Sequence, residues 1–115
     1  MVENGADDHG VRTIYSGGAS YGPYRMLVPG TYLVECGGSG LEKLSFDCVY
    51  TDTFPDGQPL PVQIERSVKE QRSDRISYYF SLDTVRENVE TRFFNKSGET
   101  VTLTGLKIKR VGAPE

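Results

Sequence analysis

The sequence predicts an all-β protein, a single antiparallel β-sandwich or barrel of about eight strands. Two observations favour this fold class. Apolar side chains recur at every second residue in several runs, of which Ile76–Leu82 is the clearest, and a period of two is typical of strands with one buried face. Clusters of Gly, Pro, Asn and Asp separate these runs at intervals of roughly 8–12 residues, as the turns of such a fold require.

The composition is that of one soluble domain. The chain has 115 residues, 37% of them hydrophobic, with a formal net charge of -3. This length supports a core without disulfides or metal. The acidic balance disfavours nucleic acid as a partner, and no run approaches the roughly 20 apolar residues of a membrane span. Since the first residues carry no visible secretion signal, we expect a cytoplasmic protein without membrane insertion.

The domain boundaries follow from periodicity. Residues 1–10 are acidic and show no periodicity, so we predict a flexible N-terminal tail, with a second short tail over 112–115. The β-sandwich domain is then expected to span 11–111. Its first strand is predicted at Val11–Ser16, and the glycine-containing segment that follows, up to Ser20, is predicted to be a loop.

The stretch Tyr21–Cys36 is predicted to be the first sheet-forming unit. It contains two alternating runs, Tyr24-Met26-Val28 and Tyr32-Val34-Cys36, joined by Pro29-Gly30. Proline presets φ at the second position of a type II turn and glycine accepts the positive φ of the third. We therefore expect two half-buried strands connected by a tight turn.

The middle of the chain alternates between strands and polar connections. After the glycine cluster 37–40, a strand with one buried face is predicted through Leu44, Phe46, Cys48 and Tyr50. Residues 51–61 contain three prolines and are predicted to form a long loop, a class of segment that often carries function. A strand is expected to resume at Val62 and run to about Val68, followed by a polar turn, with a short helix within residues 65–75 as the alternative.

The last third of the sequence is predicted to form a β-hairpin. Asp83–Asn88 has the spacing of a helix start, but the β-branched and aromatic run Val89–Phe94 favours a strand, and the segment remains open between helix and loop. The four residues 95–98 suit a hairpin loop before the final strand. In that strand the apolar residues switch from odd-numbered to even-numbered positions at Gly105, which predicts a β-bulge there. The predicted core comprises Tyr32, Val34, Leu44, Phe46, Tyr78, Phe80, Leu82, Phe93, Val101, Leu103 and Ile108.

The two cysteines, Cys36 and Cys48, lie on the apolar phase of two predicted neighbouring strands. Buried free thiols are expected, since such cysteines behave as small hydrophobic residues. A disulfide between them remains the alternative, because side-by-side strands permit one in a favourable register.

Short motifs resemble a known type of domain. The runs Tyr21-Gly22-Pro23-Tyr24 and Leu27-Val28-Pro29-Gly30-Thr31-Tyr32-Leu33-Val34 are similar to the opening strands of small jelly-roll domains. Those domains accompany bacterial glycosyltransferases and other enzymes of surface polysaccharides. The ending, Val89–Phe94 followed by Val101–Arg110, resembles their final hairpin and, more loosely, that of jelly-roll carbohydrate-binding modules. The resemblance covers roughly residues 13–110 and implies a jelly-roll fold with a non-catalytic role alongside glycans. The resemblance identifies no ligand-binding residue, because the matching positions are structural ones.

The inventory of catalytic residues is poor. The single histidine, His9, lies in the predicted tail, so no Ser-His-Asp or Cys-His arrangement can be assembled on the strands. Carboxylates such as Asp47 and Glu90 have no spacing that separates a catalytic pair from solvated strand faces. We therefore expect no enzyme. For a metal, Asp52 and Asp56 in the long loop are candidate oxygen ligands of Ca²⁺, although Asp56-Gly57 fits a simple turn equally well.

Glycan binding is the leading hypothesis. Aromatic rings supply stacking surface, while arginine and carboxylates bond to vicinal hydroxyls. On the exposed phase of the predicted strands, the candidate ligand-binding residues are Tyr79, Arg92, Phe94, Glu90 and Arg25. The chain has no tryptophan, the residue that sugar-binding modules usually present, so tyrosine would take that role. The rival hypothesis is a structural or protein-interaction module without a small ligand, pairing through a sheet edge or face with a partner or in a homodimer.

Overall fold

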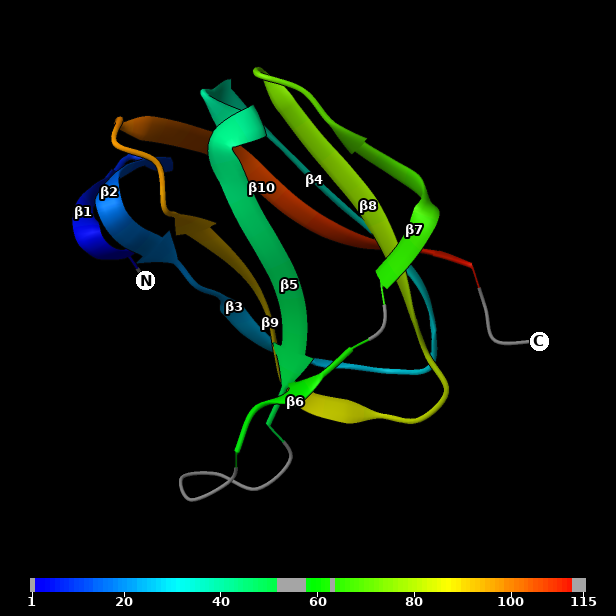
Figure 1. Ribbon diagram of the computed structural model, residues 1–115. Helices are drawn as coiled ribbons and strands as arrows, with labels where there is room; N and C mark the ends of the chain where they lie inside the picture. Colours follow the sequence, from blue (N-terminus) through cyan, green and yellow to red (C-terminus); the bar gives the residue numbers. More distant parts are fainter. Residues whose placement is uncertain (1, 52–57, 63, 113–115) are drawn as a thin grey trace.

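The computed structural model describes residues 2–51, 58–62 and 64–112, and the fold over these residues is all-β (Figure 1). Apart from the single turn of 3-10 helix η1 (Leu41–Lys43), its regular elements are strands. In chain order these are β1 (Val2–Asp8), β2 (Val11–Ser20), β3 (Pro23–Leu27), β4 (Gly30–Ser39), β5 (Leu44–Tyr50), β6 (Leu60–Pro61), β7 (Ile64–Gln71), β8 (Arg75–Leu82), β9 (Arg86–Asn95) and β10 (Val101–Gly112). The predicted all-β, antiparallel class is confirmed. The expected β-sandwich (jelly roll) is not, because the strands belong to one sheet instead of two packed sheets.

The strands form one curled sheet. Its order is β6-β5-β9-β2-β10-β4-β8-β7, with β1 added beside β2 and β3 beside β9. The curl brings the β5 side of the sheet to face β8 across the interior, where the rings of Phe46 and Tyr78 stack with centroids 5.0 Å apart. The sheet is thus a half-barrel around one core, continuous from β6 to β7 over the described residues.

Hydrogen bonds link the two ends of the curled sheet. At one corner the side-chain amide of Gln71, the last residue of β7, donates to the carbonyl oxygens of Leu41 at 2.9 Å and Leu44 at 2.7 Å. The backbone N–H of Val62 donates to the carbonyl oxygen of Cys48 at 2.8 Å and extends the pairing of β5 with β6. The Gln71 hydrogen bonds therefore bridge the open side between β5 and β7 at one end.

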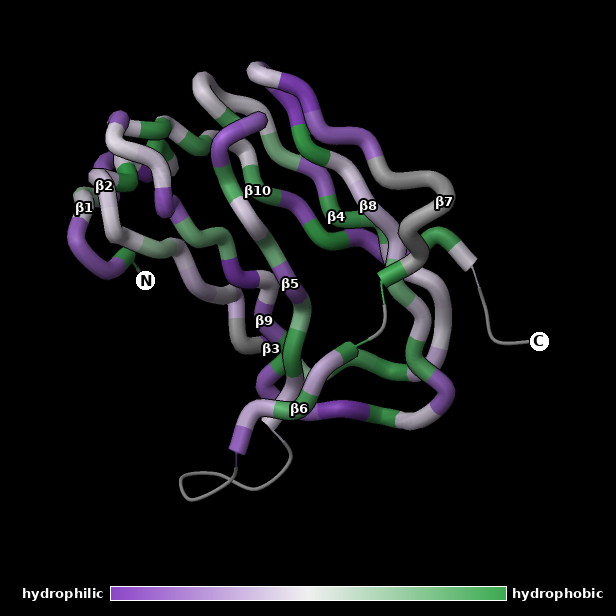
Figure 2. The backbone as a smooth tube through the Cα atoms, in the orientation of Figure 1, coloured by the Kyte–Doolittle hydropathy of each residue, from purple (hydrophilic) through white to green (hydrophobic). Residues whose placement is uncertain are grey.

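The core occupies the inside of the curl, and hydrophobic and hydrophilic residues alternate along β10 in the tube of Figure 2. Every predicted core residue belongs to the buried cluster, with Phe46 partly buried against it. The Tyr78 hydroxyl lies in this apolar interior and shares a hydrogen bond of 2.5 Å with the Thr91 hydroxyl. Burial raises the pKa of Tyr78 well above its ordinary value.

The N-terminal segment differs from the prediction. Residues expected to form a flexible tail pair with β2 as strand β1, from Val2 opposite Ser20 to Asp8 opposite Val11. The segment after Ser16, expected to be a loop, continues β2. Nearly all of β1 is exposed, so backbone hydrogen bonds rather than a buried face hold it, and such pairing leaves no apolar alternation in the sequence.

The Pro29-Gly30 turn also differs, because the strands it connects do not pair with each other. β3 pairs with β9, whereas β4 pairs with β10 and β8, so the turn carries the chain from one part of the sheet to another. The hydroxyl of Tyr32 donates to the Val28 carbonyl at 2.6 Å and fixes this crossing. The phase of β3 is opposite to the expected one, since Leu27 is buried while Met26 is 64% exposed.

Of the later predictions, the β-bulge and the free cysteines are confirmed. The segment left open between helix and loop is neither from Arg86 onward, because those residues already belong to β9. The β-bulge lies at Gly105, where φ is +62° and the pairing with β4 shifts register between Thr104 and Lys107. β7 extends to Gln71, beyond its expected end near Val68. Both cysteines are free and buried, although their strands, β4 and β5, are not neighbours in the sheet.

Candidate functional site

The candidate residues lie in three places. Glu90, Arg92 and Phe94 share the outward face of β9, because the alternate residues of that strand enter the core. Tyr79 is on the outward face of β8, beside Leu33 of β4. Arg25, on β3, reaches toward β10 and donates to the carbonyl oxygen of Ile108 at 3.4 Å. The structure therefore brings three of the five candidates together and separates the other two from them.

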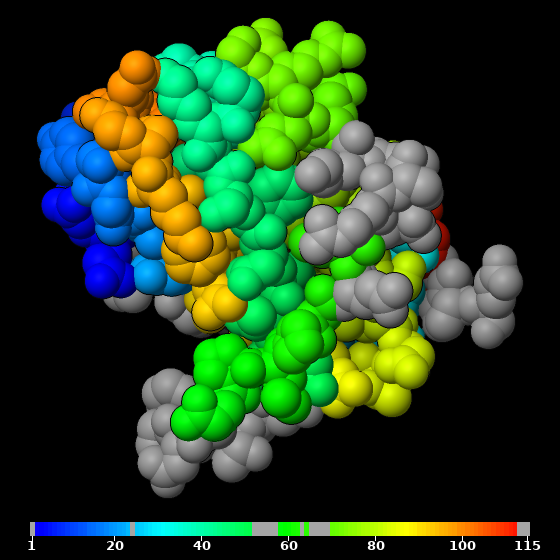
Figure 3. Space-filling view, viewed as in Figure 1, coloured from blue at the N-terminus to red at the C-terminus, as the bar shows by residue number. Residues whose placement is uncertain are grey.

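The outward face of β9 gains further side chains from its neighbours. In the register of β5 against β9, Asp47 lies opposite Arg92 and Ser45 lies opposite Phe94. The connection between β2 and β3 adds Tyr21, whose ring meets Phe94 edge-on with centroids 6.2 Å apart. We call the set Tyr21, Asp47, Glu90, Arg92 and Phe94 the β9 face. Figure 3 looks onto the side of the molecule where β2, β9 and β5 lie next to one another.

Arg92 is held rigidly in this face. Its Nε donates to Asp47 Oδ1 at 2.7 Å and its Nη2 donates to Asp47 Oδ2 at 2.6 Å, a two-pronged pair. The guanidinium carbon lies 5.4 Å from the centre of the Phe94 ring, in a cation–π contact. Hydrogen bonding to Asp47 raises the pKa of Arg92, so its charge is permanent. The pair leaves other N–H groups of the guanidinium available, because arginine carries five donors.

Glu90 is the unusual member of the β9 face. It is only 8% exposed, and its Oε2 accepts no hydrogen bond among the described residues. Its cross-strand neighbours are Val49 on β5 and Pro23 on β3, neither of which has a side-chain donor to offer. A buried acceptor without a donor costs roughly 1–3 kcal/mol of stability. Such a group is retained at a cost, as is typical of a binding site.

Tyr21 completes the rim of the β9 face. Its hydroxyl donates to Glu3 Oε2 at 2.7 Å, so the exposed strand β1 helps to orient the ring. This hydrogen bond is the main reason why the pKa of Tyr21 is raised, followed by desolvation of the ring. The ring itself is half-buried and offers apolar surface next to Phe94.

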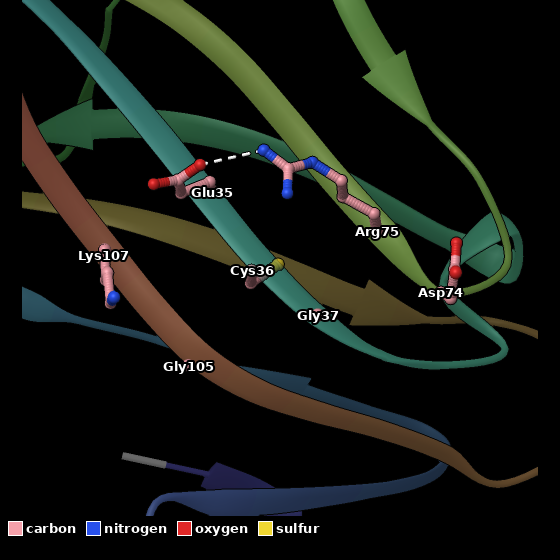
Figure 4. Close-up of a pocket in the computed structure, with 7 residues that line it drawn as sticks. All are labelled: Glu35, Cys36, Gly37, Asp74, Arg75, Gly105 and Lys107. Carbon is pink, nitrogen blue, oxygen red and sulfur yellow. Dashed lines mark hydrogen bonds and ion pairs between the residues drawn. The ribbon is translucent and has the colours of Figure 1, made fainter.

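A second polar feature is a hollow of about 380 Å³ on the outside of β4, β8 and β10 (Figure 4). Two glycines, Gly37 and Gly105, help to line it and add no side chain. Glu35 on β4 accepts from Arg75 on β8 at 2.9 Å, and Lys107 lies on β10, on the other side of β4. Because Glu35 also lies 3.7 Å from Lys109, its carboxylate is already compensated and the hollow has no unsatisfied group of the kind found at Glu90.

The sequence identified Asp47 only as a strand carboxylate without catalytic spacing, and Tyr21 was not among the candidate ligand-binding residues. Their link to Arg92 and Phe94 depends on the register of β5 against β9 and on the path from β2 to β3. The only local signal was the alternation of Glu90, Arg92 and Phe94, which placed these three side chains on one face.

The chemistry of the described residues offers little to a catalyst. Burial raises the pKa of Cys36 to about 11 and that of Cys48 to about 12, so both are thiols rather than nucleophilic thiolates at neutral pH. His9 lies in the turn between β1 and β2 and is exposed. Asp52 and Asp56, the candidate calcium ligands, lie outside the described residues. Within the described residues, no cluster of three or more His, Cys, Asp or Glu side chains is suited to a metal ion.

The described part of the chain contains no helix long and apolar enough to cross a membrane. Comparison with models of known families and with curated proteins gave no match to this chain.

Proposed function

We propose that this protein is a non-catalytic carbohydrate-binding domain and that the glycan binds on the β9 face. The observation that supports this most strongly is the Glu90 carboxylate, which is nine-tenths buried and keeps one oxygen without a donor. Because this oxygen is covered by its neighbours, a sugar hydroxyl reaches it only when the covering side chains move aside. The hydrogen bond that it would then form is to a charged acceptor, the stronger kind.

The neighbours of Glu90 supply the other contacts that sugars need. The Tyr21–Phe94 pair offers aromatic surface against which the C–H groups of a sugar ring pack. Arg92 presents its remaining N–H donors beside that surface, held in place by Asp47. An acceptor, donors and apolar surface thus lie on one strand face, as specific recognition of a polyhydroxylated ring requires.

The kind of protein to which this domain belongs is part of the same proposal. The all-β fold is compatible with the family resemblance of the sequence, and on that resemblance we propose that this is an accessory domain of a bacterial protein of polysaccharide metabolism. A glycan is then its partner, and the residues that would hold calcium, if it takes part, are Asp52 and Asp56.

The first experiment is a glycan-array screen of the purified domain, repeated with Ca²⁺ and with a chelator. Reproducible binding to a defined glycan is expected. Binding lost on chelation would show a calcium dependence, which Asp52→Asn/Asp56→Asn would then assign to these two residues or exclude from them. A blank array, with a sample shown by circular dichroism to be folded, would overturn the proposal.

Variants of the β9 face then test the site. Glu90→Gln removes the charged acceptor at nearly constant size and is expected to weaken binding of the array's best glycan about tenfold or more. Phe94→Ala is expected to weaken it similarly through lost stacking. The matched control is Tyr79→Ala, since Tyr79 is also an outward, half-buried aromatic residue but lies on β8. A loss of affinity in Tyr79→Ala, with Glu90→Gln unchanged, would move the site to the other side of the sheet.

A further inference from the structure

The curled sheet is split between β3 and β10. β10 pairs with β2 only from Val101 to Thr104, and from Gly105 onward its only paired strand among those described is β4. β3 pairs with β9. The result is a groove of about 830 Å³ that runs along the unpaired side of β10, with walls from β3 and from the β1–β2 turn.

The backbone of β10 is exposed to pairing in this groove. The Ile108 carbonyl accepts a long hydrogen bond of 3.4 Å from the side chain of Arg25, so this carbonyl points across the groove toward β3. An added strand would take the place of Arg25 at this carbonyl. Strand backbone groups alternate in direction, so the groups of Arg110, two residues along, point the same way. An unpaired edge of this kind is a template for one more antiparallel or parallel strand.

The groove is basic, although the whole chain has a net charge of -3. Four cationic side chains and one carboxylate line it, namely Arg12, Arg25, Lys107, Lys109 and Asp7. Arg12 is held by Asp7 at 3.3 Å and Lys109 lies near Glu35. Arg25 and Lys107 form no ion pair within the described part of the chain, so their charges are available to a ligand.

The groove also has an apolar component. Val11, which is 40% exposed, and the partly buried Leu106 contribute to its lining together with Leu103 and Ile108. A strand added here would direct alternate side chains toward this surface and toward the solvent-exposed cations.

We propose that the groove between β3 and β10 binds an extended acidic peptide segment of a partner protein, which adds as a strand to the free edge of β10. The unpaired backbone fits a peptide better than a polyanionic saccharide, which has no N–H and C=O ladder to offer. The basic lining favours an acidic segment. This site is separate from the β9 face, so the inference does not depend on glycan binding.

The test is selection from a displayed library of random ten-residue peptides on the immobilised full chain. Enrichment of acidic peptides rich in β-branched residues is expected. The double variant Arg25→Glu/Lys107→Glu should weaken the best peptide at least about tenfold, because it reverses both unpaired charges. The matched control, Arg72→Glu/Lys96→Glu, reverses two exposed charges outside the groove and should leave affinity unchanged.

Two further measurements separate strand addition from simple charge attraction and from glycan binding. Two forms of the peptide are made, one N-methylated at its odd-numbered amides and the other at its even-numbered amides. Only one form should lose binding, because only one of the two sets of N–H groups faces β10. The β9-face variant Glu90→Gln should bind the peptide as the wild type does. The proposal is overturned if no peptide is enriched, if both methylated forms bind like the parent, or if the double variant retains affinity. It is also overturned if the groove proves to be filled by a second copy, seen as a dimer that dissociates in the double variant.

Discussion

Replacing the unpartnered carboxylate should make the protein more stable. In Glu90→Met the chain keeps an unbranched side chain of similar length at a position that is 8% exposed, next to the buried Val49. Removing a buried acceptor that lacks a donor recovers roughly 1–3 kcal/mol. Part of this gain is offset, because the Glu90 charge is attracted to Arg92. We therefore expect the free energy of unfolding to rise by about 1 kcal/mol, or the melting temperature by about 4 °C.

Urea denaturation followed by circular dichroism measures this change, since the chain lacks tryptophan. The matched control is Glu35→Met, because Glu35 is also a strand carboxylate but is satisfied by Arg75 at 2.9 Å and should not gain stability when replaced. If Glu90→Met destabilises the protein by 1 kcal/mol or more, at about the scale of an ordinary lost hydrogen bond, Glu90 has a structural partner and the argument for a ligand there fails.

Three other predictions concern the framework. Asn95→Asp should lower the free energy of unfolding, measured by urea denaturation, by about 2–3 kcal/mol. The fully buried Asn95 amide donates to the carbonyls of Ile14 at 2.8 Å and Glu99 at 2.7 Å, and a carboxylate cannot donate; an unchanged midpoint would contradict this. Gly38→Ala should destabilise the protein by about 2 kcal/mol or more, because φ at Gly38 is +150° and the new Cβ would overlap the Thr102 carbonyl. The control Gly98→Ala, with open space around the new Cβ, should leave the free energy of unfolding unchanged. The raised thiol pKa values disfavour thiolates in the folded state relative to the unfolded chain, whose thiols titrate near 9.0. The contribution of the thiols to stability should therefore be constant below pH 8 and decrease between pH 9 and about 12. The raised pKa of Tyr78 adds to the loss at the alkaline end, so the thiol part is measured as the difference from Cys36→Ala/Cys48→Ala; no difference would show that the thiols are not buried.

The strands with a buried face could be predicted because their apolar alternation is local. Ile76–Leu82 forms β8, and the change of phase at Gly105 identified the bulge in β10. β1 was missed since its residues bury almost nothing and pair with β2 through the backbone, which leaves no apolar alternation in the sequence. The Pro29-Gly30 motif indicated a reversal of direction, but whether the two flanking strands pair is decided by distant partners, β9 for one and β10 and β8 for the other.

The candidate site, too, could be predicted only where the signal in the sequence is local. The face shared by Glu90, Arg92 and Phe94 follows from alternation along one strand, which sequence reveals. The two-pronged bond from Arg92 to Asp47 depends on a cross-strand register, and the burial of Glu90 depends on the neighbours that β3 and β5 bring to it. Neither relation has a local signal, so Tyr79 and Arg25 could not be separated from the β9 face by sequence alone.

The most direct test of glycan binding at the β9 face is an NMR titration of the ¹⁵N-labelled domain with the strongest glycan from the array. The proposal predicts chemical-shift changes concentrated on the backbone amides of β9 around Glu90–Phe94, of β5 around Asp47 and of Tyr21, with β8 and the groove along β10 unaffected. Shifts confined to β8 or to the β10 groove, or none at millimolar glycan, would contradict it.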